Sequence, residues 1–434
     1  MRSHASAGPP VRRSAPLLAI LFLAACHVPN EEPRITLRVL NWATDLELTT
    51  EQRIADRWAA GRPGVTVEVD AVTANYGEKL ATSIASGAPP DVFLLDSPDI
   101  PAFVDRGLAL DLTPYLARVG YAPADVFPEV LGVFQRGPQL FAFPKGFSPF
   151  VVYYNRRLFR ELGVPEPADT GWTWDGFLAA ARALTRDLDG DGRVDVYGVN
   201  FPRQLYEWIP FVWSAGGDIL DPGGARTSGY LDGPATVETF AFLTSLVTEH
   251  RVTPPLQFLR AGDPMRVARF YLGRQGMLVS AHWQLPRLVA YAERGDLEVG
   301  VAPIPRRPGA QLRTAVYASG WAVPANVPHK RLAVELAAYL AGPEAQRLRA
   351  ESRLEIPALR SVAEAIAAAD PTGVERAFLR LVPFGRPPWG ATVPDFHEIE
   401  EMSFDIMDRI LLRGESPPAA ARAVARRIDE VISR

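Results

Sequence analysis

Residues 87–95 read Gly-Ala-Pro-Pro-Asp-Val-Phe-Leu-Leu, a turn followed by an almost continuous apolar run. Such a run is typical of a β-strand that is buried on both faces of a sheet. Two strands are predicted upstream, at 35–42 and 65–69, with amphipathic helices at 51–60 and 78–86. Strands that alternate with helices predict a parallel, doubly wound α/β sheet, which binds ligands at the carboxyl ends of its strands.

The rest of the chain continues this mixed pattern. Further strands are predicted at 151–154, 277–280, 299–302 and 316–323, and further helices at 100–106, 174–185, 236–250, 265–274, 331–340, 343–351, 399–413 and 417–433. The chain has 434 residues, more than one compact core normally holds, so two or three folded units are expected.

The composition excludes several classes of protein. Hydrophobic residues make up 47% of the chain and charged residues 22%, which argues against disorder, coiled coil and collagen. The formal net charge of −4 leaves no basic surplus for phosphates, so nucleic acid is not an expected partner. The six histidines are dispersed, and no serine-hydrolase elbow, zinc-protease helix, P-loop or dinucleotide-binding motif is present. No enzyme signature emerges, and no catalytic residue is assigned.

The N-terminal segment resembles a bacterial lipoprotein signal. Arginines precede an apolar run at 17–25, which is too short to span a bilayer and ends in Leu23-Ala24-Ala25-Cys26. The resemblance implies a signal peptide at 1–25 and a polar tether at 26–33, with lipidated Cys26 holding the protein to a membrane. The alternative is a plain secretory peptide with an incidental cysteine. Because Cys26 is the only cysteine, no disulfide is expected.

One acidic loop has the spacing of a calcium site. Asp187, Asp189, Asp191 and Asp195 occupy positions one, three, five and nine of an EF-hand loop with Gly192 at six. Arg193 would offer its backbone carbonyl. The twelfth position is a glycine, and a strand is predicted where the second helix should begin. We therefore expect a weak structural calcium, with a solvated acidic turn as the alternative, and no other cofactor is required.

Seven segments carry a recognisable pattern. They are residues 87–93, 105–115, 153–165, 172–177, 276–283, 320–321 and 343–346. Taken in order, they resemble the extracellular solute-binding proteins of ABC importers, specifically the maltose-binding-protein-like carbohydrate family. The resemblance covers essentially all of the mature chain.

The resemblance implies two doubly wound α/β lobes joined by a multi-crossing hinge, the type II periplasmic-binding fold. The crossings are expected near 143–148, 302–305 and 355–358. Lobe one would then comprise 34–143 plus 305–355, and lobe two 144–304 plus 356–434. The lobes would close around a ligand by a hinge motion.

The resemblance also implies a function. We expect a monomer that captures a carbohydrate between its lobes and delivers it to the permease and ATPase of an ABC importer, in the periplasm or at the cell surface. Two alternatives stay open. One is a secreted glycosidase that uses a carboxylate pair, and the other is the same fold binding a polyamine, an anion or a peptide.

Candidate ligand contacts follow from the chemistry of sugars, which are bound by aromatic rings and planar hydrogen-bonding groups. Trp42 follows the first strand and Asp96 follows the buried strand, so both are expected at carboxyl ends. A core aromatic and a helix-capping carboxylate are the structural alternatives. Asp45 is a weaker candidate in the loop after Trp42. The resemblance adds Ser148, at the first crossing, and Trp283, which follows a later strand.

The remaining candidates are aromatic. Tyr206, Trp208 and Trp213 belong to a region that lines the cleft in relatives, although a place in the lobe-two core is equally compatible. Trp321 and Trp389 complete the set. For His282, a hydrogen-bonded structural histidine is the simpler interpretation.

Overall fold

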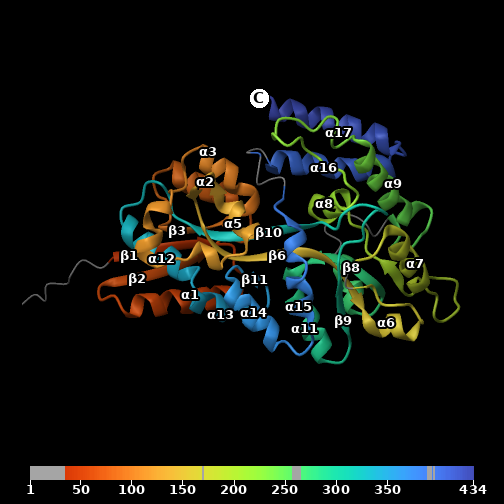
Figure 1. Ribbon diagram of the computed structural model, residues 1–434, viewed down its shortest axis with the longest axis horizontal. Coiled ribbons are helices and arrows are strands. Elements are labelled where there is room, and N and C mark those ends of the chain that lie inside the picture. Colours follow the sequence, from red (N-terminus) through yellow and green to blue (C-terminus); the bar gives the residue numbers. More distant parts are fainter. Residues whose placement is uncertain (1–34, 169–170, 257–264, 389–392, 394–395) are drawn as a thin grey trace, which may run out of the picture.

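The computed structural model describes residues 35–434 except 169–170, 257–264, 389–392 and 394–395. The described chain forms two α/β lobes that lie side by side (Figure 1). The predicted signal peptide, tether and Cys26 lie outside the described residues. No helix within the described ranges combines the length and the apolar character needed to cross a bilayer.

A single ten-stranded sheet runs through both lobes. Its main path is β2-β1-β3-β10-β6-β8-β7, with β9 and β11 paired to β6 and β12 paired to β10. The bounds are β1 (Ile35–Asn41), β2 (Val65–Ala71), β3 (Val92–Asp96), β6 (Phe143–Asn155), β7 (Tyr197–Val199), β8 (Gln275–Ala281), β9 (Val299–Ala302), β10 (Thr314–Ala322), β11 (Ile356–Pro357) and β12 (Gly385–Arg386). A separate two-stranded sheet consists of β4 (Gln135–Arg136) and β5 (Gln139–Leu140).

The first lobe follows the predicted parallel pattern. β1 pairs in parallel with both β2 and β3, and the connecting helices carry the chain from one strand to the next. The apolar run Val92–Leu95 is fully buried, because it lies inside the sheet and helices cover it. The helices of this lobe are α1 (Asp45–Ala60), α2 (Tyr76–Ala85), α3 (Ile100–Asp105), α4 (Leu116–Val119), α5 (Pro128–Leu131), α12 (Lys330–Leu340) and α13 (Pro343–Ala350).

The second lobe surrounds the other end of the sheet, where β8 pairs in parallel with β7. Its two C-terminal helices pack on each other and on α9, and α16 reaches toward the junction with the first lobe (Figure 1). Its helices are α6 (Arg156–Glu161), α7 (Trp174–Leu184), α8 (Leu205–Trp213), α9 (Pro234–Thr248), α10 (Met265–Tyr271), α11 (Leu285–Glu293), α15 (Val374–Leu379), α16 (Phe396–Leu411) and α17 (Pro417–Ile432), while α14 (Arg360–Ala369) lies beneath the junction.

Two long antiparallel strands connect the lobes. β6 is buried along all 13 residues; its first part pairs with β10 and its second part with β8 and β9. β11 joins β6 at Gly146 and Phe147. Gly146 is needed there because a Cβ atom would collide with the Glu355 side chain.

The second predicted crossing, at 302–305, is followed by contacts with the second lobe. Arg306 and Arg307 donate backbone hydrogen bonds to the carbonyls of Trp172 and Ser214 in the second lobe, at 3.0 and 3.1 Å. These contacts hold the chain on the second lobe beyond β9. The chain then enters β10, which pairs with β3 of the first lobe. The predicted lobe boundaries stay a prediction.

Candidate binding cleft

A cleft of about 490 Å³ lies between the two lobes. Its walls come from the carboxyl ends of β1 and β3, from β6 and β10, and from the start of α16. The lining residues are Trp42, Thr44, Glu47, Asp96, Pro98, Gly146, Phe147, Ser148, Tyr206, Trp283, Tyr317, Ala318, Ser319, Leu354, Glu355, Phe396, His397 and Glu400.

Trp42 and Asp96 form the wall on the first lobe, each directly at a strand end. The ring of Tyr76 meets the Trp42 indole edge to face, with centroids 5.0 Å apart. The Tyr76 hydroxyl donates to the carbonyls of Leu40 and Leu94, at 3.1 and 2.7 Å. Tyr76 therefore ties the indole to two neighbouring strands, which orients it beside the cleft.

The wall on the second lobe is an aromatic cluster of four rings. Trp283 lies 5.3 Å from Phe150 and 6.2 Å from Tyr317, centroid to centroid, and Tyr206 lies 5.8 Å from Phe150. Trp283 meets Phe150 and Tyr317, and Tyr317 meets Phe150, edge to face, an arrangement that aromatic quadrupoles favour, whereas Tyr206 is tilted against Phe150. They arrive from β6, α8, β10 and the turn after β8, so the wall depends on the assembled lobe.

Two partly buried carboxyl groups line the cleft from opposite lobes. Asp96 accepts a hydrogen bond from the backbone N–H of Ser97 at 2.8 Å. Burial, reinforced by the nearby Asp99 carboxylate, raises the pKa of Asp96 to about 7. Burial also raises the pKa of Glu400 on α16. Both side chains thus resist ionisation in the protein.

An ion pair spans the cleft beside these carboxyl groups. Nε2 of His397, on α16 of the second lobe, lies 2.8 Å from Oδ1 of Asp99, which follows β3 of the first lobe. The hydrogen bond to Asp99 raises the pKa of His397. The contact therefore favours the protonated imidazole and links the two lobes.

The base of the cleft is an ion pair between connecting segments. Lys145 on β6 pairs with Glu355, which directly precedes β11, and Ser319 on β10 donates to the same carboxylate at 3.3 Å. The side chains of Lys145 and Glu355 are only 10% and 15% exposed. All three connecting segments thus meet at one shielded carboxylate.

Behind Trp42, a second pair is buried. Arg349 donates hydrogen bonds to both carboxylate oxygens of Glu51, and its Nη2 lies 2.6 Å from Oε2. Burial opposes the ionisation of Glu51, but Arg349 outweighs it and the pKa of Glu51 lies below its ordinary value. The pair anchors α13 to α1.

Five of the ten predicted ligand contacts line this cleft, namely Trp42, Asp96, Ser148, Tyr206 and Trp283. They come from segments far apart in the chain. Asp45 begins α1, next to the cleft residue Thr44, but its side chain is not among those described. Trp389 lies outside the described residues.

Three other predicted contacts are placed elsewhere, and we remove them from the candidates. Trp208 and Trp321 are fully buried in the cores of lobe two and lobe one. Trp213 donates to Asp218 at 2.9 Å and lies beneath the guanidinium of Arg386. The helix that carries Trp208 and Trp213 is apolar on nearly every side, so its sequence does not show which ring faces the ligand.

His282 is a structural histidine, as its simpler interpretation predicted. It is buried, and its Nε2 lies 3.0 Å from a carboxylate oxygen of Glu375.

Sequence reasoning missed most of the lining residues, among them Tyr317, Phe396, His397 and Glu400. The last three lie on the first turns of α16, about 300 residues after β3 in the chain. No local signal in a C-terminal amphipathic helix indicates that its first turns cover a cleft.

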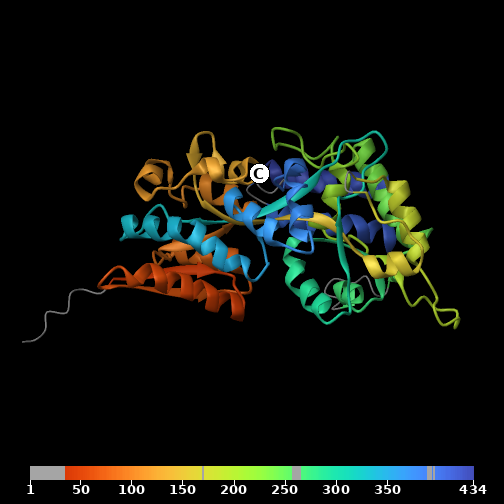
Figure 2. The same cartoon turned by 60° about the horizontal axis from the view of Figure 1, so that its bottom comes forward.

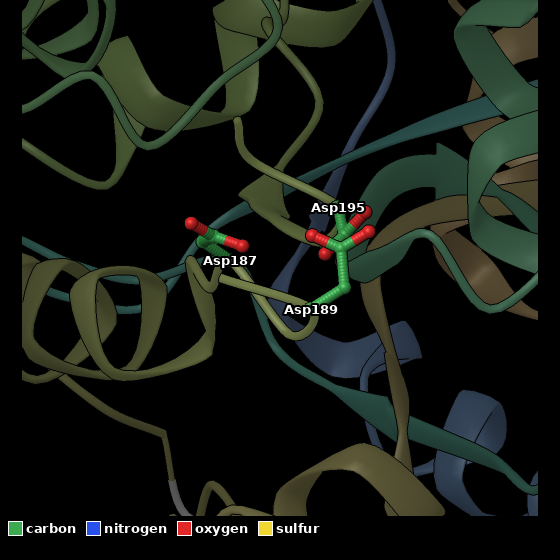
Figure 3. Close-up of side chains that lie close together, drawn as sticks. All are labelled: Asp187, Asp189 and Asp195. Carbon is green, nitrogen blue, oxygen red and sulfur yellow. The ribbon is translucent and has the colours of Figure 1, made fainter. Parts of the chain in front are cut away.

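The acidic loop protrudes from the second lobe between α7 and β7 (Figure 2). Asp187, Asp189 and Asp195 each place one carboxylate oxygen within 4.8 Å of the others (Figure 3). The backbone N–H groups of Gly192 and Gly190 donate to Asp187 and lower its pKa.

Asp191, also predicted as a ligand, is not in this group of three carboxylates. The carboxylate of Asp191 instead accepts the backbone N–H of Arg193 at 2.8 Å. The predicted contribution of Arg193, its backbone carbonyl, stays a prediction.

Comparison with known proteins shows which family and which relatives this chain resembles. Residues 43–347 match the family described as bacterial extracellular solute-binding protein. A binding protein of Brucella abortus is 23% identical over 425 residues, which cover 97% of this chain and 98% of that protein. The diacetylchitobiose binding protein of Streptomyces coelicolor is 24% identical over 361 residues, covering 80% and 78%.

A solved structure agrees with the fold. The ABC substrate-binding protein of Listeria monocytogenes in complex with cycloalternan superposes with a TM-score of 0.80 at 22% identity, covering 92% of this chain and 99% of that one. The predicted type II periplasmic-binding fold is confirmed. Since the family match spans more than half of the chain and the two lobes enclose a cleft, the chain belongs to the bacterial extracellular solute-binding proteins.

Proposed function

We propose that the protein binds a carbohydrate in the cleft between its lobes and delivers it to the permease of an ABC importer. The observation that carries the proposal is the pair of aromatic walls, Trp42 on one lobe and Trp283 on the other. Flat rings pack against the apolar C–H faces of pyranose sugars. Asp96 and Ser148 provide the few polar groups that fix orientation in such sites.

The relatives support the same class of ligand. One binds diacetylchitobiose, and another was solved with cycloalternan, both of which are oligosaccharides. The volume of about 490 Å³ lies in the ordinary range for small-molecule sites.

Membership of this family supports a role in binding rather than in catalysis. Its members are exported binding proteins rather than enzymes, so the ligand should leave the cleft chemically unchanged. We further propose that lipidated Cys26 anchors the mature protein to a membrane and that the protein acts as a monomer. The lipobox-like sequence around Cys26 supports the anchor.

A thermal-shift screen against mono-, di- and oligosaccharides tests the proposal. A ligand present at about 100 times its Kd adds roughly 2.7 kcal/mol to the free energy of unfolding. For a sugar so identified, we expect W42A and W283A each to weaken binding about tenfold or more. W172A replaces a half-buried tryptophan outside the cleft and should leave the affinity unchanged. Sugar cleavage, or shifts with polyamines or peptides alone, would contradict the proposal.

A further inference from the structure

The cleft holds more negative charge than its positive groups balance. The carboxylates among its described lining residues are Glu47, Asp96, Glu355 and Glu400. Lys145 neutralises Glu355, and the imidazole of His397 is engaged by Asp99. Within the described part of the chain, Asp96 and Glu400 therefore face the cleft without an ion pair of their own.

These two carboxyl groups approach the cleft from opposite lobes. Burial raises the pKa of both, and the carboxylate of Asp99 adds to the effect on each. Both side chains are partly buried, and the charge of His397, which is paired with Asp99, offsets the effect on their pKa values only in part. A partly buried carboxylate whose charge is not balanced destabilises the folded state. Such an arrangement in a binding cleft is typical of a site in which the ligand supplies the missing charge.

A third group, on Tyr317, also favours a ligand that is positively charged and donates hydrogen bonds. Tyr317 lines the cleft, and its hydroxyl is buried and has no hydrogen-bond partner among the described residues. After burial, the charges of Glu400 and Asp96 are among the causes that raise the pKa of Tyr317, so its hydroxyl lies within the field of both carboxylates. Two carboxyl groups and one hydroxyl that can accept hydrogen bonds thus belong to residues that line the same cleft.

We infer that the ligand is a carbohydrate bearing a protonated amine, which Asp96, Glu400 and Tyr317 hold while its ring packs on the aromatic walls. The inference rests on the proposed function above and narrows its substrate class. An ammonium group has three donors and a positive charge, matching three acceptors of which two are anionic. A sugar hydroxyl has one donor and no charge. A linear polyamine matches the charge but has no ring face for Trp42 and Trp283.

Calorimetric titration with matched sugars tests the inference. Each set shares one skeleton and differs only in the group at carbon two: chitobiose, diacetylchitobiose and cellobiose, then glucosamine, N-acetylglucosamine and glucose, then the corresponding galactose set. At pH 7 we expect the amine of at least one set to bind about tenfold or more tightly than its acetamide and hydroxyl counterparts, since hydrogen bonds to charged groups are the stronger ones.

Three variants separate this charge effect from a general change in the cleft. D96N and E400Q keep the shape of each side chain and remove its charge, so the preference for the amine should fall to about threefold or less. E401Q removes the adjacent exposed carboxylate of the same helix and should retain the full preference. Amine binding should also release protons at pH 7, because a cation lowers the pKa of the Asp96 carboxyl, which lies at about 7. Titrations in two buffers of different ionisation enthalpy measure that release.

The outcomes distinguish a failure of the amine inference from a failure of the proposed carbohydrate function. Equal or tighter binding of a neutral member would overturn the amine inference and leave the carbohydrate function standing. Loss of the preference in E401Q as well would overturn the assignment to Asp96 and Glu400. Binding of spermidine with no saccharide bound would overturn both the inference and the carbohydrate function.

Discussion

Asp96 makes the stability of this protein depend on pH in an unusual direction. Its pKa rises from 3.8 to about 7, chiefly by burial, so the folded state holds the proton more tightly than the unfolded state. The free energy of unfolding contributed by this group therefore falls as the pH rises from about 4 to about 7. We expect D96N to have a higher Tm than the wild type at pH 8, and the difference to shrink toward pH 4.

Thermal unfolding across that pH range provides the measurement. D105N removes an exposed aspartate of the same lobe and should not change the pH profile. A D96N variant that is less stable than the wild type at pH 8 would show that the ionised carboxylate is stabilised in the cleft.

Trp42 and Trp208 show how far residue types and positions predict a site. Trp42 could be found because it ends a strand, and strand ends in α/β sheets converge on the binding edge. Trp208 belongs to a helix in which eight of nine residues are buried, so periodicity gave no preferred face. Packing against lobe two, which depends on distant segments, places that ring in the core.

Helix α16 is the element whose role most depends on the assembled fold. Its His397 pairs with Asp99 of the other lobe, and the hydrogen bond that the imidazole donates to the Asp99 carboxylate raises the pKa of His397 above its ordinary 6.5. The pair therefore contributes fully below about 6.5, and its contribution disappears as the pH rises through the higher folded-state pKa.

A double-mutant cycle with H397A and D99A measures this contact. We expect a coupling of about 0.2–1 kcal/mol in the free energy of unfolding at pH 6, since the imidazole is largely exposed. The coupling should vanish at pH 9. Arg160 and Glu298 form a surface pair within lobe two, whose coupling should be the same at both pH values. A pH-independent coupling at His397 would refute the assignment.

The loop between α7 and β7 is the element with a candidate cation site, and we propose that it takes a structural calcium. Three carboxylate oxygens already converge there, and mutual repulsion favours a cation among them. Millimolar Ca²⁺ should raise the Tm by a few degrees. D189N should abolish the shift, whereas D191N, which lies outside the group of three, should largely retain it. An unchanged Tm with calcium would identify the loop as a solvated turn.

For the whole molecule, the attachment of the N-terminus decides where the protein acts. We expect the wild-type protein to fractionate with membranes and to incorporate labelled fatty acid in a bacterial host, through Cys26. C26S should be exported without label or attachment, because a secretory signal and the folded lobes remain intact. Labelling of C26S would show that the lipid is attached elsewhere.

The order of strands and helices was largely readable from the sequence, whereas the joining of the lobes was not. Local alternation indicates β1, β2 and β3, and amphipathic spacing indicates the C-terminal helices. The path of the chain after β9 depends on hydrogen bonds from Arg306 to Trp172 and from Arg307 to Ser214. These partners lie far apart in the sequence, so no local pattern encodes the contacts. The same limit applies to His397 and Glu400 in the cleft.

The strands β6 and β10 pair across the junction between the lobes, with one register shift between Ser319 and Gly320, and β6 continues along β8 in the second lobe. When the angle between the lobes changes, the hydrogen-bonded pair of β6 and β10 must therefore twist, because no flexible linker takes up the motion there. Such a joint is elastic: its restoring torque opposes displacement and returns the molecule to its rest angle once the ligand has gone. Mechanical load applied to either lobe should also pass to the other through the shared strands, so the two lobes should rupture together.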